Sequence, residues 1–318
     1  VTKQDAENWD VSPHTFSEDL GALNLFVNNE EDRVTNGALD YTSIWISSAE
    51  QLNAINAYKK DESGSGILGY NFALKNDIDA SQLDDFVPIG IVADTDSVIK
   101  DLGFSGTFNG RDYRIIGLTA EASASNTGLF STLLGTVKNL NIYASRFEGI
   151  DTAGAVAGKN SGVIDNVTTL GNYVVATGSG ASQAVILGAA GGIAGVNQGT
   201  ISNVTAADAV VAQGDGDSVN NVRVTAGGVT GINQGSISQV NVLSAVTASQ
   251  AENSYGLGGV AGLNLSEASI AGAVNTGVTH ARYGNTITAS SVGGIAGANL
   301  GSISDSYNDG DITGGNYV

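Results

Sequence analysis

The sequence predicts an all-β protein in which the chain winds into a parallel β-helix. A phrase of glycine, small and aliphatic residues ending in asparagine recurs five times: AGAVAGKN from residue 153, GGIAGVN from 191, GGVTGIN from 227, GGVAGLN from 258 and GGIAGAN from 293. The second positions of these phrases lie 38, 36, 31 and 35 residues apart. Repeats of about 20 to 50 residues indicate a solenoid, because one repeat buries its apolar side only when its neighbours stack on it.

The residue types within each repeat favour strands over helices. Gly, Val, Ile, Thr and Ser alternate in short segments that end in turns such as Asn-Gln-Gly, a pattern typical of strands. One repeat divides into strands at 192–196, 200–205 and 209–213 with a turn at 197–199, which makes one coil of a parallel β-helix. We expect about eight coils, which at ~4.8 Å each would form a rod about 40 Å long.

Equivalent residues of successive coils should stack in ladders. Two aliphatic ladders are predicted inside the coil, one of Val156, Ile193, Val229, Val260 and Ile295 and one of Ile164, Ile201, Ile237, Ile270 and Ile303. The asparagines of the repeated phrases fall at a tight turn, where Asn tolerates a left-handed backbone; they are Asn160, Asn197, Asn233, Asn264 and Asn299. We interpret them as an internal amide ladder, and the alternative is a catalytic or ligand-binding role.

The chain that precedes the repeats divides into two parts. Residues 1–42 carry no repeat and are predicted to be a cap or a segment that pairs with another subunit, whereas residues 43–318 form the β-helix. Ser48 and Gln51 make a capping box at the start of an amphipathic segment. A short N-terminal helix is therefore expected to plug the first coil.

The segments upstream of the repeats carry a family resemblance. They read ISSAEQLNAINAYKK, LGYNFALKNDIDAS, FVPIG, LGFSGTFNGRDYRIIGL and NTGLFSTLLGTVKNLNIYA. Together with repeats of the GGIAGVNQGTI kind, this order resembles the GLUG-motif proteins over about residues 43 to 313. The resemblance implies a right-handed parallel β-helix of a secreted bacterial exoprotein, as in filamentous-haemagglutinin-like adhesins and in the accessory regions of bacterial immunoglobulin A proteases.

Charge and composition exclude several classes of partner. The chain has 32 acidic against 13 basic residues and a net charge of -19, which disfavours binding to nucleic acid or to an anionic membrane. No stretch approaches the ~20 apolar residues that a membrane-spanning helix needs, so membrane insertion is not expected. Cys and Met are absent, which excludes thiolate metal sites and cysteine nucleophiles. We expect a secreted protein, located outside the cell or on its surface.

The chain is predicted not to be an enzyme. Its two histidines are His14 and His280, and it has no HExxH motif, so the zinc-protease activity of immunoglobulin A proteases is not implied. The enzymatic alternative is a polysaccharide-cleaving β-helix, which would gather charged residues on one strand face. The only such cluster is Arg111, Asp112 and Arg114, which we interpret first as a solvated turn and strand edge.

Carbohydrate binding would require aromatic side chains gathered on one face. The tyrosines are instead spread over different predicted coils; they include Tyr113, Tyr143, Tyr173, Tyr255, Tyr283 and Tyr307. The sequence alone leaves open whether the fold brings several of them together.

No cofactor is required by this interpretation, and Ca²⁺ is the ion for which the sequence offers candidate ligands. Hard cations take carboxylate and carbonyl oxygens. Four pairs of aspartates are candidates, namely Asp77 and Asp79, Asp94 and Asp96, Asp215 and Asp217, and Asp309 and Asp311. None forms an EF-hand loop, and each is interpreted first as a polar turn.

These observations predict a non-catalytic extracellular rod that serves as the stalk or binding segment of a bacterial surface adhesin or matrix exoprotein. Its expected partners are a host or neighbouring cell surface, glycans or matrix. One alternative is a self-assembling fibre subunit whose copies dock end to end, because an uncapped β-helix end exposes strand edges. The other is a polysaccharide-binding or polysaccharide-cleaving β-helix.

Overall fold

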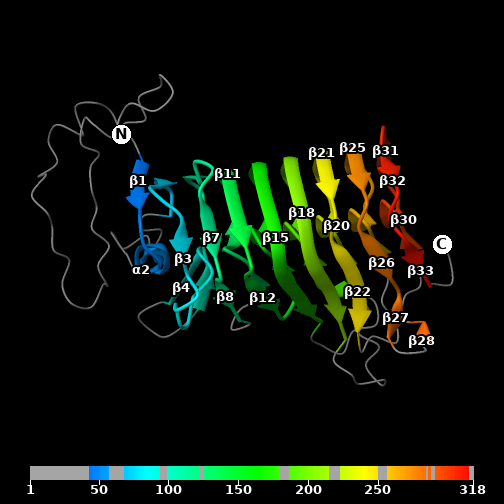
Figure 1. The fold of residues 1–318 in the computed structure, drawn as a ribbon, viewed down its shortest axis with the longest axis horizontal. Helices are drawn as coiled ribbons and strands as arrows, with labels where there is room; N and C mark the ends of the chain where they lie inside the picture. Colours follow the sequence, from blue (N-terminus) through cyan, green and yellow to red (C-terminus); the bar gives the residue numbers. More distant parts are fainter. Residues whose placement is uncertain are drawn as a thin grey trace, which may run out of the picture.

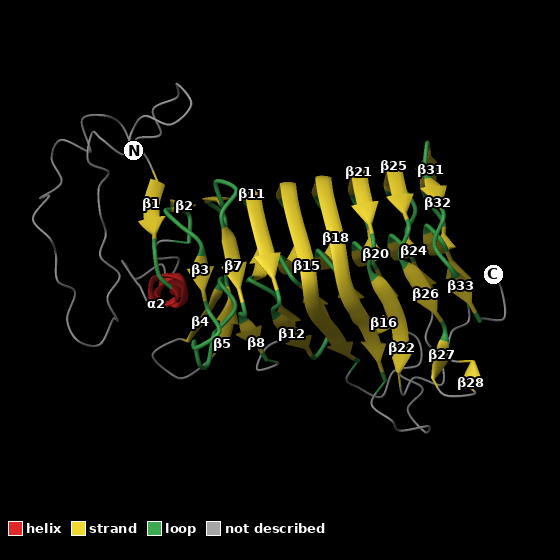
Figure 2. Ribbon diagram, viewed as in Figure 1, coloured by secondary structure: helices red, strands yellow, loops and turns green. Residues whose placement is uncertain are grey.

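The computed structural model describes residues 43–56, 68–93, 99–121, 125–178, 186–214, 223–249, 256–283, 286–287 and 291–314. In these residues the chain forms a parallel β-solenoid with a short helix at its N-terminal end, as the sequence predicts. Figure 2 shows the strands stacked side by side along one axis, with the single helix beside β1. The predicted segment 1–42 lies outside the described residues.

One face of the solenoid is a long sheet of 17 strands. Every pairing that joins neighbouring turns of this sheet is parallel, and Figure 1 shows its strands in sequence order from β1 at one end to β33 at the other. Its strands are β1 (Ser43–Ile46), β2 (Asn71–Leu74), β3 (Ile78–Asp79), β6 (Thr107–Asn109), β7 (Arg114–Ile116), β8 (Thr119–Ala120), β11 (Thr136–Tyr143), β12 (Arg146–Gly149), β15 (Val163–Thr177), β18 (Thr200–Gln213), β21 (Ser236–Val242), β22 (Ala245–Ser249), β25 (Ser269–Asn275), β26 (Val278–His280), β31 (Ser302–Ser304), β32 (Tyr307–Asn308) and β33 (Ile312–Thr313).

Two short sheets of six strands each complete the coil. The first short sheet contains β10 (Phe130–Leu133), β14 (Ala157–Asn160), β17 (Ala194–Asn197), β20 (Thr230–Asn233), β24 (Ala261–Asn264) and β30 (Ala296–Asn299). The second short sheet contains β9 (Asn126–Thr127), β13 (Thr152–Gly154), β16 (Ile186–Gly191), β19 (Arg223–Gly227), β23 (Gly256–Gly258) and β29 (Val292–Gly293). Each turn of the chain passes through the second short sheet, then the first, then the long sheet.

The solenoid has about six turns, so the predicted number of eight coils was too high. Only six turns contribute a strand to both short sheets within the described ranges. The first strands of the long sheet, β1, β2 and β6, stack without counterparts in either short sheet. Bulky aromatic side chains fill this end of the interior; those that are fully buried are Phe72, Phe104, Phe108 and Phe130. The glycine-rich corner that makes a regular turn begins only after them.

Both predicted aliphatic ladders are confirmed. In the long sheet, Ile164, Ile201, Ile237, Ile270 and Ile303 are register partners in successive turns, and Val137 precedes them. In the other ladder, the backbone amide of each residue donates to the carbonyl of its counterpart in the next turn, from Val156 to Ile295. Burying these side chains contributes about 1.5 to 3 kcal/mol each relative to exposure, so the apolar ladders supply much of the driving force for stacking.

Small residues in the repeated phrase are required by the close approach of the two short sheets. A methyl group added to Gly195 would lie 2.7 Å from the carbonyl oxygen of Gly158 and 2.8 Å from the backbone nitrogen of Ala153. Gly231, the equivalent residue one turn later, would bring a methyl group within 2.8 Å of the backbone nitrogen of Ala190. The glycines of this column therefore face the interior, where a larger side chain would collide with the backbone of the neighbouring strands.

The two ends of the solenoid differ. At the N-terminal end, α2 (Ala49–Asn53) and the 3-10 helix η3 (Ala54–Asn56) cover the core with the fully buried side chains of Leu52 and Ile55. Ser48 is the N-cap residue, and its hydroxyl accepts a hydrogen bond from the Gln51 amide at 3.3 Å. At the other end, Ile295, Ile303 and Ile312 are only partly buried, although their counterparts one turn earlier are inaccessible.

Two antiparallel hairpins interrupt the parallel pattern. They are β4 (Ile91–Ala93) with β5 (Ile99–Asp101), and β27 (Arg282–Tyr283) with β28 (Thr286–Ile287). Asp101 attaches the first hairpin to the solenoid, because its carboxylate accepts hydrogen bonds from the hydroxyls of Ser131 and Thr132 at 2.8 Å each. No helix within the described ranges has the length and apolar character needed to cross a bilayer.

Candidate functional site

The asparagines of the repeated phrases line up inside the solenoid as a chain of side-chain hydrogen bonds. Each Nδ2 donates to the Oδ1 of the next asparagine, at 2.8, 2.8, 2.8 and 2.7 Å for the four successive pairs from Asn160 to Asn299. The first four side chains are fully buried, and Asn299 at the C-terminal end is exposed. This geometry is that of an internal amide ladder.

The buried carboxamides also hold the turn between the first short sheet and the long sheet. Each Nδ2 donates a second hydrogen bond to the carbonyl that begins the next turn's long strand, as Asn160 does to Thr200 at 3.3 Å. The Oδ1 of Asn160 additionally accepts from the Gly162 amide at 3.1 Å. Both N–H donors of each buried carboxamide are used in this way, one within the ladder and one to the backbone.

The left-handed backbone expected at these asparagines occurs six residues later in most turns. None of the ladder asparagines has a positive φ, because each is the last residue of a regular strand. The positive φ falls instead at a bend within the long sheet, with values between 47° and 63°; the residues are Asn139, Asn166, Asn203, Gln239, Gly272 and Asp305. Asn, Asp and Gly are the residue types that adopt this conformation at least cost.

A second polar cluster inside the solenoid surrounds Asp208, which lies on β18 and is 3% exposed. Its Oδ2 accepts a hydrogen bond from the Thr169 hydroxyl at 2.5 Å. Its Oδ1 accepts from the backbone amide and from the Nδ2 of Asn172, at 3.0 and 2.8 Å. Burial raises the pKa of Asp208 to about 6, and the hydrogen bonds from Thr169 and Asn172 only partly oppose this effect.

The Asp pairs considered for Ca²⁺ are only partly within the described residues. Asp94, Asp96, Asp215 and Asp217 lie outside them. Within the described ranges, no three His, Asp or Glu side chains are placed to hold a metal ion together.

The four described aspartates of these pairs are exposed and have local roles. The carboxylate of Asp77 accepts a hydrogen bond from the Arg114 amide at 2.9 Å, and that of Asp79 accepts from the Ser81 amide at 3.0 Å. Asp309 donates its backbone amide to Asn275, and Asp311 accepts from the Thr279 amide with its carbonyl.

The outer face of the long sheet carries a strip in which arginines cover aromatic rings. The guanidinium carbon of Arg111 lies 4.5 Å from the Trp45 ring centre, that of Arg114 lies 5.5 Å from Tyr143, and that of Arg146 lies 4.7 Å from Tyr173. Arg111 also lies 5.9 Å from the ring of Tyr113. We name these seven residues the arginine–aromatic strip: Trp45, Arg111, Tyr113, Arg114, Tyr143, Arg146 and Tyr173.

Parallel register explains why the strip forms. Arg146 of β12 is the register partner of Tyr173 in β15, so the two side chains stand side by side on the outer face. Arg114 pairs with Asn141, which places it diagonally from Tyr143, two residues further along β11. An arginine in one turn and a tyrosine in the next thus meet at the ~4.8 Å distance between turns, which favours a cation–π contact.

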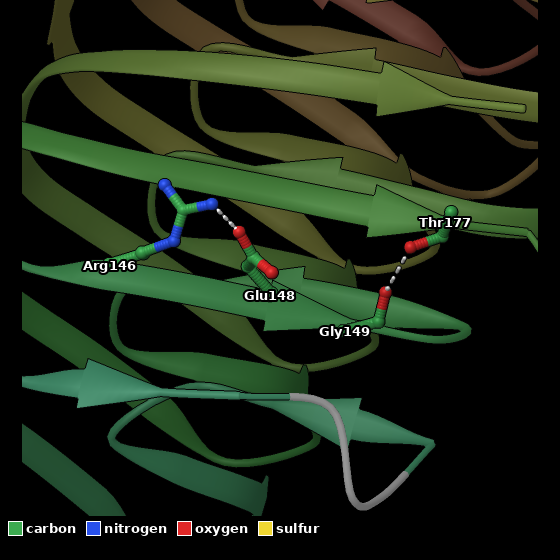
Figure 3. A network of polar contacts seen from close by, with 4 residues as sticks. All are labelled: Arg146, Glu148, Gly149 and Thr177. Carbon is green, nitrogen blue, oxygen red and sulfur yellow. Dashed lines mark hydrogen bonds and ion pairs between the residues drawn. The ribbon is translucent and has the colours of Figure 1, made fainter. Parts of the chain in front are cut away.

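Arg146 has a second partner, because its guanidinium forms an ion pair with Glu148 on the same strand (Figure 3). The side chains of Arg146 and Glu148 are 49% and 31% exposed, so solvent reaches both groups. Nearby, the Thr177 hydroxyl donates to the Gly149 carbonyl at 3.4 Å and joins β15 to β12. The pair leaves Arg146 accessible from outside the sheet.

The structure brings together residues that the sequence analysis kept apart. Arg111 and Asp112 occupy the predicted turn, with φ of 51° and 64°, and Arg114 begins β7. Tyr143 and Tyr173 lie on the outer face in successive turns and each is covered by an arginine, whereas Tyr113 packs against the buried core. The proximity of these arginines and tyrosines can be found in the sequence only when residues 27 to 30 positions apart are compared.

His280 and Asp208 were not anticipated as the structure has them. His280 is the last residue of β26 and is partly buried. Asp208 was overlooked, although its alternation with Ala206 and Val210 marks it as an inward-facing residue.

The fold and its ladders define a repeat-built parallel β-solenoid, and comparisons with known proteins agree. Residues 288–313 match the family described as the GLUG motif. An alignment of 173 positions to halomucin of Haloquadratum walsbyi is 30% identical; it covers 49% of this chain and 2% of halomucin's length. The predicted GLUG resemblance is thus confirmed for the last repeat.

A solved structure shows the same fold over most of the chain. It is a crystal structure, at 1.30 Å resolution, of a Bacteroides ovatus protein proposed to be an immunoglobulin A1 protease. The TM-score is 0.61 with 21% sequence identity, and the similarity covers 88% of this chain and 85% of that one. At this identity the likeness concerns the fold alone.

Replacing one ladder asparagine should destabilise the whole solenoid. In Asn197→Leu, the Nδ2 of Asn160 and the Oδ1 of Asn233 lose their partner while they remain buried. Each orphaned buried polar group costs about 1 to 3 kcal/mol, so the free energy of unfolding, measured with urea, should fall by about 2 to 5 kcal/mol. The control is Gln198→Ala, which removes an exposed amide contact to Gln234 and should cost under ~1 kcal/mol. Equal losses would contradict a special role for the buried ladder.

Asp208 should make stability depend on pH in an unusual direction. A carboxyl group whose pKa is raised by folding stabilises the folded state fully below its unfolded pKa of about 4, and this contribution is lost as the pH rises through about 6. The advantage of wild type over Asp208→Asn should therefore shrink by about 2 to 3 kcal/mol between pH 4 and 7 in urea titrations. Asp165→Asn is the control, because hydrogen bonds from Ser202 and Asn203 lower the pKa of Asp165 and predict the opposite trend. The same trend in both variants would refute the assignment.

Proposed function

We propose that this chain is a non-catalytic extracellular rod, a stalk or binding segment of a surface adhesin or matrix exoprotein. The observation that carries the proposal is the unbroken stacking of like residues through the turns, in two aliphatic ladders and one amide ladder. Each turn is fixed by both neighbours, so the shaft resists bending and holds its outer face in a set orientation. A stiff rod that presents one outer face in a fixed orientation can hold a binding surface away from the cell that carries it.

The comparisons support an extracellular place. Part of the chain is similar to halomucin of Haloquadratum walsbyi, and residues 288–313 match the GLUG motif, which resembles motifs of secreted exoproteins. The net charge of -19 favours solubility and disfavours binding to nucleic acid or to an anionic membrane. We infer glycans, matrix or a host or neighbouring cell surface as its partners, and adhesins of the filamentous-haemagglutinin kind as its nearest functional parallel.

Adhesion should be measurable on the isolated chain. Beads coated with it should attach to cell-wall, mucin or matrix-coated surfaces more than albumin-coated beads do, because the rod presents its outer face to the surface. The same preparation should leave immunoglobulin A1 intact on gels and the viscosity of polysaccharide solutions unchanged. Antibody fragments or falling viscosity would overturn the non-catalytic assignment, and attachment no better than albumin would overturn the adhesive one.

The last described turn supports a second candidate, a self-assembling fibre subunit. Within the described ranges, β29, β30 and β31 are the last strands of their columns, and each has one edge without a strand partner. Beside these edges lie the partly buried Ile295 and Ile303 and the 68% exposed Leu300. An unpaired edge next to apolar side chains is a template for another strand. In this proposal Ca²⁺ would bind between copies through Asp309 and Asp311, which follow β32 at the same end.

Self-assembly predicts concentration-dependent particles that a charge at the open end abolishes. In negative-stain electron microscopy with Ca²⁺ or with chelator, wild type should form end-to-end particles and Ile303→Asp should remain single rods. The control is Leu134→Asp, because Leu134 is 49% exposed but lies several turns away from the open end. Single rods of wild type at every concentration would exclude the fibre, and assembly unaffected by chelator would exclude Ca²⁺ as its joint.

A further inference from the structure

Part of the long sheet of this acidic protein is free of charge on its outer face. The strands concerned are β18, β21, β22, β25 and β26, which lie side by side in Figure 1. Asp208 is the only Lys, Arg, Asp or Glu residue in these strands, and its side chain is buried inside. Because the whole chain has a net charge of -19, a face without carboxylates is the one that another acidic molecule approaches at least cost.

Two neighbouring columns of this outer face carry apolar side chains. In one column, Ala209, Ala245 and Val278 are register partners in successive turns. In the column beside it, Leu170 pairs with Ala207, and the amide of Leu243 bonds the carbonyl of the residue before Ala207. We name the six residues of the two columns the apolar face: Leu170, Ala207, Leu243, Ala209, Ala245 and Val278.

The apolar face is accessible and uneven. Leu243 is 54% exposed and Leu170 is 48% exposed, so solvent reaches both side chains. The neighbours of Leu243 along and across the sheet include Ala207, Ala209 and Ala245. Leu243 therefore projects beside a depression formed by alanines. Apolar side chains that gather at an exposed place mark an interaction surface more often than apolar side chains exposed singly.

The apolar face is self-complementary under a two-fold rotation. A two-fold axis perpendicular to the sheet, at its centre, brings Leu243 of one copy over Ala209 of a second copy. The same rotation brings Leu170 over Val278 and Ala207 over Ala245. The projecting side chain of each copy thus meets a small one, and every contact occurs twice, as in an isologous interface.

Carboxylates at one end of the two columns determine the relative direction of the copies. Asp309 and Asp311 continue these columns in the next turn, and both are exposed. Two copies that lie side by side in the same direction would bring these carboxylates together. The two-fold rotation places them at opposite ends instead, each near the β12 end of the other copy, where Arg146 and Glu148 neutralise one another. Charge therefore favours the antiparallel arrangement.

We propose that the apolar face binds the same face of a second copy whose shaft runs in the opposite direction, an inference that rests on the adhesive role proposed above. Shafts that project from two facing cells meet in opposite directions, so this contact joins neighbouring cells through like molecules. The face spans three steps of ~4.8 Å and two columns, which is less than the ~800 Å² that each partner of a stable dimer buries. A single pair is therefore weak, and many pairs between two surfaces reinforce one another.

Sedimentation velocity of the full chain tests the contact directly. Between about 1 and about 500 µM, wild type should show a monomer–dimer equilibrium with a Kd on the order of 100 µM and no larger species. Raising NaCl from about 0.1 to about 0.5 M should tighten the dimer, because salt screens the repulsion between two acidic bodies and spares the apolar contact. Leu243→Asp buries an unpaired charge at the centre and should weaken the dimer at least about tenfold.

The matched control is Leu134→Asp. Leu134 is 49% exposed, but it follows β10 at the corner between the first short sheet and the long sheet. The same change of charge at this place should leave the Kd within about twofold of wild type. Circular dichroism and urea unfolding of both variants establish that these substitutions of exposed side chains leave the fold intact.

Cross-linking tests the antiparallel direction. The chain has no cysteine, so each introduced thiol is unique. A mixture of Ala207→Cys and Ala245→Cys proteins, treated with a short bis-maleimide, should give the mixed dimer, because the two-fold rotation brings these positions together. Asp311→Cys should not link to itself. Linking of Asp311→Cys to itself without the mixed dimer would show parallel copies and overturn the arrangement.

Further outcomes would overturn the inference: a monomer at every concentration, a dimer that Leu243→Asp leaves intact, or an equal loss in Leu134→Asp. Growth beyond the dimer that Ile303→Asp stops would indicate end-to-end assembly instead. Binding of neutral dextran to a monomeric chain, abolished by Leu243→Asp, would assign the apolar face to a glycan.

The bead assay separates this inference from the proposed function. If coated beads attach to mucin or matrix while the chain does not dimerise, the rod is adhesive through another contact and only the inference about a second copy fails. If beads neither attach to these surfaces nor cluster with one another, the adhesive role fails as well.

Discussion

Every feature of this solenoid depends on hydrogen bonding between the backbones of successive turns. Parallel pairing fixes the register, so residue 164 must meet 201, and 201 must meet 237, with no freedom to slip. A slip of one residue would turn every side chain of a strand to the other face. Once the register is fixed, whatever stands at one position in a repeat must be compatible with a copy of itself directly above and below. The repeated sequence therefore consists of residues whose side chains can pack against identical residues in the neighbouring turns.

Asparagine and isoleucine meet this requirement in different ways. Stacked isoleucines exclude water and gain dispersion contacts, which are not directional. A stacked carboxamide offers its donors to one neighbour and its acceptor to the other, so a column of buried asparagines is satisfied by itself except at its ends. A buried aspartate has no such option, because it only accepts when it is ionised. The Asp208 carboxylate therefore accepts hydrogen bonds from Thr169 and Asn172, and its pKa is raised all the same.

The sequence predicts the repeated part of the fold well because its period and ladder residues are visible in the letters themselves. The first turns were harder, since Phe72, Phe104 and Phe130 replace the glycine-rich corners and no internal copy defines their register. The left-handed positions were misplaced by six residues, because Asn occurs at both places and sequence alone does not tell which one bends. The arginine–aromatic strip depends on diagonal neighbours in adjacent turns. Arg114 and Tyr143, or Arg146 and Tyr173, become neighbours only when the number of residues in that one turn is known.

The direction of the amide ladder gives the rod a further property. All four inter-asparagine hydrogen bonds run the same way, with the nitrogen on the N-terminal side and the oxygen on the C-terminal side. Each carboxamide is a small dipole, and aligned dipoles add, as the peptide dipoles of an α-helix do. The shaft is therefore electrically polar along its length whatever its net charge, with the terminal Asn299 amide as one pole. The two ends of the amide column therefore differ in the group that they present, a feature that the symmetric aliphatic ladders do not have.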